Sequence, residues 1–267
     1  MKTKIALIVQ IFISEVIKLR STFGFWLSIL YPLGTLLLVS LLWISMRNRT
    51  PNLQEFIINT GNTAGFFLPF FIVLIISVSC NIEHKSSMLK HIASLPVPRH
   101  LFYFGKFAGI MFYILLAFIA TLAFTYLSLF ICGLFWPTLG FGNNFNHLLL
   151  ITTILRGYLA AAAIYPIQFW LGMKLKNLTM PVAIGSALII LPIATLIIMG
   201  ISGLMNEKDN FTRIITYDPY SYPFATAFNL LKTAEISLFP TVTIVYIGIG
   251  IVILLAGSYE FSRRNIG

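Results

Sequence analysis

The sequence predicts an all-α integral membrane protein with six transmembrane helices. Hydrophobic residues make up 58% and charged residues 10% of its 267 residues, a composition far outside that of soluble proteins. A helix needs about 20 apolar residues to cross the hydrocarbon core. Stretches of that length occur at residues 23–46, 63–82, 107–132, 148–173, 179–204 and 238–259. Their hydrophobicity is continuous and does not alternate, so we expect helices and not barrel strands.

The basic residues indicate which way the spans face. The segments before the first span, between the second and third, between the fourth and fifth, and after the sixth hold 12 basic and 3 acidic residues, a net charge of +9. The other three gaps hold five of each. Because Lys and Arg concentrate in short cytoplasmic loops, we predict a multi-pass protein of the cytoplasmic membrane with both termini inside. The net charge of +10 then reflects topology and attraction to membrane lipids, and nucleic-acid binding is not expected.

A separate helix is expected before the first span. Over residues 1–22, apolar residues recur at helical spacing, and charged residues that include Glu15, Lys18 and Arg20 lie among them. This pattern predicts an amphipathic helix in the cytoplasmic interface of the membrane. An extension of the first span is the alternative.

The connection between the second and third spans, residues 83–104, is the segment best suited to meet a soluble partner. A short helix is predicted in it, which Pro96 ends. Its apolar stripe consists of Met88, Leu89, Ile92 and Leu95. A stiff helix held between two spans can transmit a push into the membrane. An ordinary interfacial helix packed on lipid headgroups is the alternative.

The sequence contains no recognisable catalytic motif. It has no GxxxxGK[ST] phosphate loop, no HExxH and no GxSxG, which are the motifs of common nucleotide, zinc and serine-hydrolase sites. Its two cysteines have no CxxC spacing, and its histidines are not paired across spans. We therefore expect no catalytic residue, no metal site and no bound cofactor in this chain.

Arg156 is the one charged residue inside a predicted span. An intramembrane ionisable residue is a functional-site hypothesis, which makes Arg156 a candidate for a substrate or ion path. The alternative is helix packing or snorkelling, because Arg156 lies about two turns from the outer end of its span. No Asp or Glu falls inside a span, so no buried carboxylate is expected to couple transport to ions. An autonomous carrier or channel and an intramembrane enzyme are the second and third interpretations.

Two segments resemble a known family. The N-terminal EVIKLRSTFGFWLSILYP and the segment IEHKSSMLKHIASLPVPRHLFYFGK after the second span look like the permease subunits of type-2 (ABC-2) ATP-binding-cassette exporters, which have a type V exporter fold. The pattern is closest to the small permeases of bacteriocin and lantibiotic immunity. Span count, length and loop placement extend the resemblance over nearly the whole chain.

The resemblance implies how such a chain receives energy. Residues 1–22 would be the elbow helix, and a coupling helix would enter a cleft on a separate ATPase subunit, present in two copies. ATP and Mg²⁺ would bind to that subunit, and this chain would be non-catalytic. The coupling residues would be Glu83, His84, Lys85, Met88, Leu89, Ile92, Leu95 and Pro96.

The resemblance also implies a dimeric path for cargo. A second permease, identical or paralogous, would complete a central path, and residues 205–237 would cap it with short helices or a re-entrant hairpin. The aromatic residues of this cap are Tyr217, Tyr220, Tyr222 and Phe224; an interfacial aromatic belt is the alternative. Apolar, aromatic-rich spans favour an amphipathic cargo such as an antimicrobial peptide, a lipid or a lipophilic drug.

Overall fold

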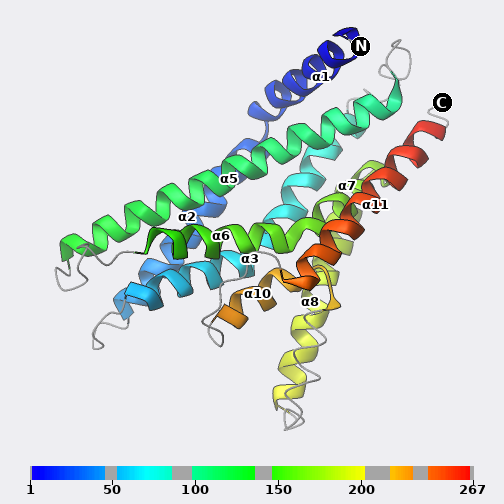
Figure 1. Cartoon of the computed structure of the whole chain (residues 1–267). Coiled ribbons are helices and arrows are strands. Elements are labelled where there is room, and N and C mark those ends of the chain that lie inside the picture. Colours follow the sequence, from blue (N-terminus) through cyan, green and yellow to red (C-terminus); the bar gives the residue numbers. More distant parts are fainter. Residues whose placement is uncertain are drawn as a thin grey trace.

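The computed structural model describes residues 2–45, 53–85, 98–135, 146–201, 217–230 and 240–264, and every regular element within these ranges is a helix. The expected all-α fold is therefore confirmed. In chain order the elements are α1 (Lys2–Arg20), α2 (Phe23–Ser45), α3 (Leu53–Lys85), α5 (Arg99–Phe135), α6 (His147–Ala160), η2 (Ala161–Ala163), α7 (Ile164–Lys174), α8 (Thr179–Ile201), α10 (Tyr222–Leu230) and α11 (Thr241–Arg263); Figure 1 shows their arrangement.

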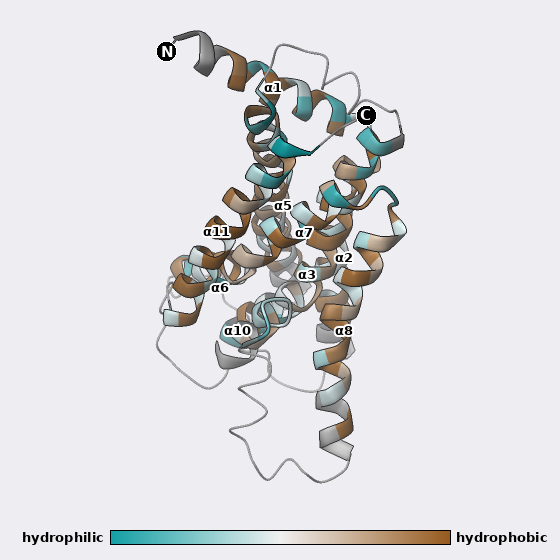
Figure 2. Ribbon diagram, turned by 90° about the vertical axis from the view of Figure 1, so that its right-hand side faces the viewer, coloured by the Kyte–Doolittle hydropathy of each residue, from teal (hydrophilic) through white to brown (hydrophobic). Residues whose placement is uncertain are grey.

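Five segments among the described residues are long and apolar enough to cross a membrane, and they are Phe23–Leu41, Gln54–His84, Arg99–Ile131, His147–Lys174 and Thr241–Arg263. The fifth predicted span corresponds to α8, with a shorter apolar stretch at Thr179–Thr195. Both termini lie at the same end of the bundle in Figures 1 and 2, as expected if α8 crosses the membrane in addition to these five segments. We call this the basic end, because Lys18, Arg99 and Arg264 lie there, and the opposite one the far end.

The second predicted span begins earlier than its hydropathy indicated. Helix α3 starts at Leu53, ten residues before the predicted boundary, because the polar residues at its start are accommodated within the helix. Thr60 Oγ1 donates to Phe56 O, and Thr63 Oγ1 donates to Asn59 O, each at 2.8 Å. Such bonds satisfy a hydroxyl without ending the helix.

The predicted connection at residues 83–104 is shorter in the structure. Helix α3 continues to Lys85 and α5 begins at Arg99, so both ends of that connection are helical. Pro98 directly precedes α5, and its carbonyl accepts hydrogen bonds from the backbone N–H groups of Leu101 and Phe102. Proline suits this place because it has no N–H to leave unpaired at a helix start.

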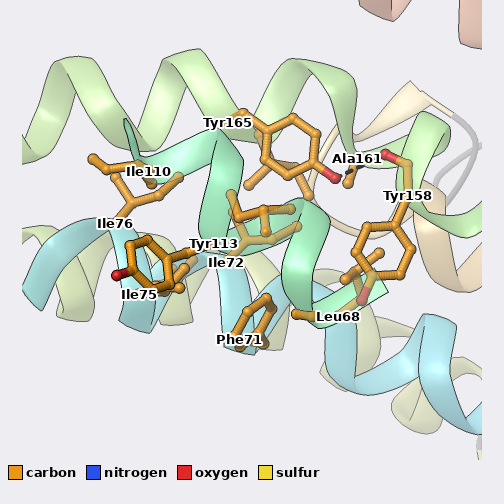
Figure 3. Close-up of a cluster of buried hydrophobic side chains, with 14 of the residues drawn as sticks. Leu68, Phe71, Ile72, Ile75, Ile76, Ile110, Tyr113, Tyr158, Ala161 and Tyr165 are labelled. Atoms are coloured by element: carbon orange, nitrogen blue, oxygen red, sulfur yellow. Dashed lines mark hydrogen bonds between the residues drawn. The ribbon is translucent and has the colours of Figure 1, made fainter. Parts of the chain in front are cut away.

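Helix α3 forms the centre of the bundle. It packs against α2, α6, α7, α8 and α10, and its residues Ile72 and Ile76 are fully buried. Figure 3 shows this core, in which Tyr113 of α5 and the tyrosines of the fourth span surround the α3 side chains. Tyr165 Oη donates to Tyr158 O at 2.8 Å, so its hydroxyl is paired although it is buried.

The fourth span is one path of three helical pieces. The 3₁₀ turn Ala161–Ala163 separates α6 from α7, and Pro166 explains the change because it cannot donate to Ala162 O four residues earlier. Helix α11 passes beside this carbonyl. A Cβ atom at Gly250 would lie 2.8 Å from Ala162 O, so glycine is required for that close approach.

Candidate functional site

Charged side chains from α1, α3 and α5 meet at the basic end. Lys106 Nζ lies 2.9 Å from Glu83 Oε1 and 3.3 Å from Glu15 Oε2. It also donates a hydrogen bond to Ser79 O at 3.2 Å. Glu15, Glu83 and Lys106 are each at most 2% exposed. Together with Lys18 we call these three residues the ion cluster.

Lys18 closes the ion cluster from the side that is partly exposed. Its Nζ lies 2.5 Å from Glu15 Oε1 and 3.7 Å from Glu83 Oε1. Two ammonium groups therefore balance two carboxylates. Buried charges offset their loss of hydration only when each faces an opposite charge at close range, and this arrangement provides that. The contacts of the ion cluster join α1 to α5, α3 to α5, and α1 to α3.

Two glycines of α5 allow α1 to lie this close. A Cβ atom at Gly105 would lie 2.5 Å from Ile11 Cγ2, and one at Gly109 would lie 2.8 Å from Glu15 Cβ. Both separations are shorter than side chains tolerate, so small residues are needed at these positions. The glycines therefore position the Glu15 carboxylate beside Lys106.

Helix α1 turns its charged side inward and an apolar side outward. Ile13 and Ile17 are 48% and 65% exposed, whereas Glu15 is buried. The helix ends at Arg20, which is exposed, and α2 begins at Phe23. The N-terminal segment is thus a separate helix, as the sequence predicted, and not an extension of the first span. Its close packing against α5 was not foreseen.

The structure places Glu83 differently from the coupling helix in which we predicted it. It lies in the last turn of α3, and at 1% exposure its carboxylate is not available to a partner. The next residue, His84, has Nε2 3.0 Å from Gly172 O of α7, and Lys85 is the last residue of α3. The remaining coupling residues lie outside the described residues, and they are Met88, Leu89, Ile92, Leu95 and Pro96.

The expectation that no carboxylate is buried is therefore wrong. Glu15 and Glu83 both lie outside the predicted spans in sequence. The folding of α1 onto α5 encloses them at the basic end, which hydropathy along the chain cannot register. The burial of Lys106 was not predictable for the same reason, because this residue lies one position before the predicted third span.

Gln168 joins three helices to the segment that precedes α10. Its Nε2 donates to Ser77 Oγ and to Pro181 O, both at 2.9 Å, and its Oε1 accepts from Tyr220 Oη at 3.1 Å. Burial raises the pKa of Tyr220, so this phenol remains a donor. Tyr220 belongs to the predicted cap at residues 205–237, yet it reaches between α3, α7 and α8. Sequence reasoning missed Gln168, although a lone amide within an apolar span was a usable signal.

The aromatic residues of the predicted cap do not form a single surface. Tyr217 is 75% exposed, and the belt interpretation fits this residue. Tyr222 is buried, with Oη 2.9 Å from Thr243 Oγ1 of α11. Phe224 is half-buried, and its ring packs edge-on against Phe66 of α3 at 5.3 Å. Three of these four aromatic residues therefore pack against neighbouring helices, and the role of the segment as a cap remains a prediction.

Arg156 lies on α6 and is enclosed by protein. It is only 7% exposed, so helix packing covers most of its side chain. In the part of the chain that the structure describes, its Nε and Nη1 have no hydrogen-bond partner. Tyr222 belongs to α10, which packs against α6. The structure thus brings together two residues that the sequence assigned to a substrate path.

The described residues offer no metal site, because no three His, Cys, Asp or Glu side chains are grouped to hold an ion. An open hollow of about 480 Å³ lies at the basic end between α7 and α11, and it is lined by Lys174, Tyr259, Glu260, Arg263 and Arg264. Lys174 Nζ lies 3.4 Å from Glu260 Oε1, and both side chains are about half exposed. Water screens this pair, unlike the ion cluster.

Comparison with known families gives one finding that covers most of this architecture. The profile of the ABC-2 family transporter proteins matches residues 11–193, a stretch that contains the ion cluster, Arg156 and Gln168. The match extends from within α1 into α8 and covers more than half of the chain. A search of curated proteins gives no match.

Proposed function

Because the chain belongs to the ABC-2 transporter family, it is a transmembrane permease component of an ABC transporter, and we propose that it exports an amphipathic cargo. We propose that a separate ATPase in two copies binds ATP and Mg²⁺ and supplies the energy, while this chain is non-catalytic and binds no cofactor. A second permease, identical or paralogous, completes the path. The basic end faces the cytoplasm, and the complex lies in the cytoplasmic membrane.

The ion cluster is the observation that carries this proposal. Helices α3 and α5 flank the connection at residues 86–98, so a force on that connection reaches both. Lys106 of α5 pairs with Glu83 of α3 and with Glu15 of α1. Separating such charges in a buried, low-dielectric site is strongly unfavourable. The three helices therefore move together when a partner pushes on the connection.

The family does not identify the cargo. The proposal covers an antimicrobial peptide, a lipid or a lipophilic drug, and the closer resemblance to bacteriocin- and lantibiotic-immunity permeases stays a prediction. We assign the candidate path to the region of Arg156 and Tyr222. Its support is the burial of a charged and a phenolic side chain between α6 and α10.

An autonomous carrier or channel is the alternative, and the two buried carboxylates bear on it. Proton- or sodium-coupled carriers use carboxylates along the transport path. Glu15 and Glu83 instead pair with lysines at the basic end. This placement favours mechanical coupling over ion coupling.

Replacement of Glu15 tests the proposal. We expect an ATPase subunit to co-purify with the tagged wild-type chain and to hydrolyse ATP several-fold faster in the reconstituted complex than alone. Glu15→Gln should retain complex formation but lose most of that stimulation, because α1 is released from α5. Glu260→Gln is the matched control, since its carboxylate is half exposed and lies outside the ion cluster.

Two outcomes would contradict the proposal at different levels. Wild-type stimulation in Glu15→Gln would show that the ion cluster does not transmit the push. Failure of any ATPase to co-purify with the wild-type chain would remove the separate energy source.

A further inference from the structure

Arg156 is a buried cation for which the described residues supply no counter-ion. It is 7% exposed, and its Nε and Nη1 are enclosed without a hydrogen-bond partner in the part of the chain that the structure describes. Charged side chains within a membrane face a polar partner or a water-filled cavity, because the hydrocarbon core strongly disfavours an unpaired charge. Within the described ranges, Arg156 therefore lacks the partner that its position requires.

The acidic residues of the described ranges are engaged elsewhere or exposed. Two belong to the ion cluster at the basic end. Glu260 pairs with Lys174 at that end as well. Asp218 Oδ2 accepts hydrogen bonds from the backbone N–H and the hydroxyl of Ser221. Glu55 is exposed at the start of α3.

Neutral groups near Arg156 also have partners already. Thr152 and Thr153 precede it by about one helical turn, and each hydroxyl donates to a backbone carbonyl at 2.7 Å. The Tyr222 hydroxyl pairs with Thr243 Oγ1 at 2.9 Å. The guanidinium can only donate, and in the described part of the chain no acceptor lies within hydrogen-bond distance of its Nε or Nη1. An anion would supply acceptors for both.

The position of Arg156 favours an anion that a lipid carries. It lies nine residues after the start of α6, about 14 Å along the helix, in the half of the span His147–Lys174 that is nearer the far end. Headgroup phosphates are the abundant oxyanions at that end of a span. On the same helix, Leu148 and Ile151 are 70% and 39% exposed, so an acyl chain has an apolar surface beside the site.

We propose that Arg156 binds the headgroup phosphate of a membrane lipid that enters from the far end. A guanidinium donates two parallel N–H···O bonds to a phosphate, which neutralises the charge and satisfies its enclosed nitrogens together. The proposal holds whether that lipid is cargo or a bound component. It does not depend on ATPase-driven transport.

Thermal unfolding of the full chain in a neutral detergent tests this site. The probe is dioleoyl phosphatidic acid, compared with dioleoylglycerol, which has the same chains without the phosphate. We expect phosphatidic acid to raise the Tm of the wild type by about 2–4 °C and dioleoylglycerol to leave it unchanged. Inorganic phosphate, which lacks acyl chains, should also give no shift.

Three variants assign the effect to Arg156. Arg156→Gln should abolish the shift and raise the Tm measured without lipid, because it removes an unpaired buried charge. Arg156→Lys should keep a smaller shift, since an ammonium lacks the planar fork. Arg263→Gln is the matched control for loss of one positive charge, and it should respond as the wild type does.

Arg156→Gln should raise the Tm measured without lipid and abolish the Tm shift caused by phosphatidic acid. This combination distinguishes ligand binding from a structural role. A residue needed only for packing would lower the Tm in both conditions. Equal shifts in the wild type and Arg156→Gln, or no shift in the wild type, would overturn the proposal. A shift of the same size with inorganic phosphate would overturn the assignment to a lipid.

Discussion

The ion cluster and Arg156 both enclose charge within the bundle, but they differ in how it is balanced. At the basic end, Lys106 has two carboxylates within 3.3 Å and the charges cancel. On α6, Arg156 is nearly as buried, yet its Nε and Nη1 have no hydrogen-bond partner in the described ranges. At the first site each charge faces an opposite charge of the same chain, although the Glu83 oxygens have no hydrogen-bond partner among the described residues. The second needs a group from outside the described residues.

This difference indicates that the ion cluster stabilises the helix packing, whereas Arg156 is suited to bind a ligand. A buried charge that is fully paired ties helices together, and its removal leaves an opposite charge stranded. A buried charge without a partner destabilises the chain until a ligand supplies an opposite charge. Removing the buried charge should therefore stabilise the lipid-free protein. Substitutions at the two sites should therefore change stability in opposite directions.

The largest effect is expected for Lys106→Met. It leaves two buried carboxylates with only the partly exposed Lys18, and breaking a buried pair in this way costs about 3–5 kcal/mol. The free energy of unfolding, measured by denaturant titration in detergent micelles, should fall by that amount. Lys174→Met, at the half-exposed pair with Glu260, should cost about 0–1 kcal/mol.

A double substitution checks that stranded charge is the cause. Adding Glu83→Gln to Lys106→Met removes one of the two carboxylates, so the pair of changes should be less destabilising than Lys106→Met alone. Additive losses would mean that the residues contribute independently and that the ion cluster is not a unit.

A smaller effect is expected for Gly109→Ala, which tests how the ion cluster is positioned. The added methyl group would lie 2.8 Å from Glu15 Cβ, so α1 must move away from α5. Such overpacking costs about 1–3 kcal/mol. Gly34→Ala is the control, because nothing lies within 4 Å of a Cβ atom at that position. Equal unfolding free energies for the two variants would show that α1 does not depend on this close approach.

The spans could be predicted from the sequence because the membrane itself sets the length of each apolar stretch and the placement of basic residues between them. The polar start of α3 was missed, since the Thr60 and Thr63 hydroxyls donate to backbone carbonyls of the same helix, which hydropathy does not register. Gln168 was visible as a lone amide. Its three partners come from separate segments, and no spacing along the chain connects them.

The two charged sites were predictable to different degrees. Arg156 stood out because it interrupts an apolar span, whereas its enclosure depends on α10, which is distant in sequence. Glu15, Glu83 and Lys106 looked like ordinary residues of a basic face. Their meeting depends on α1 folding back along α5, a tertiary contact that hydropathy does not encode.

The smallest change in stability is expected when Arg156 receives an internal counter-ion. Thr152 lies four residues before it and is 8% exposed, so Glu at this position faces Arg156 on the same side of α6. A buried Glu loses its hydration, which offsets most of its attraction to Arg156, so we expect a net gain of about 0.2–0.5 kcal/mol, as for an ordinary helical pair with this spacing. Thr152→Glu should therefore change the Tm little, but it should abolish the shift caused by phosphatidic acid, because its carboxylate occupies the guanidinium. Thr152→Gln, of the same size without the charge, should keep that shift. If Thr152→Glu responds to phosphatidic acid as fully as the wild type, the missing counter-ion is not what draws a lipid to this site, and the contrast with the ion cluster loses its functional meaning.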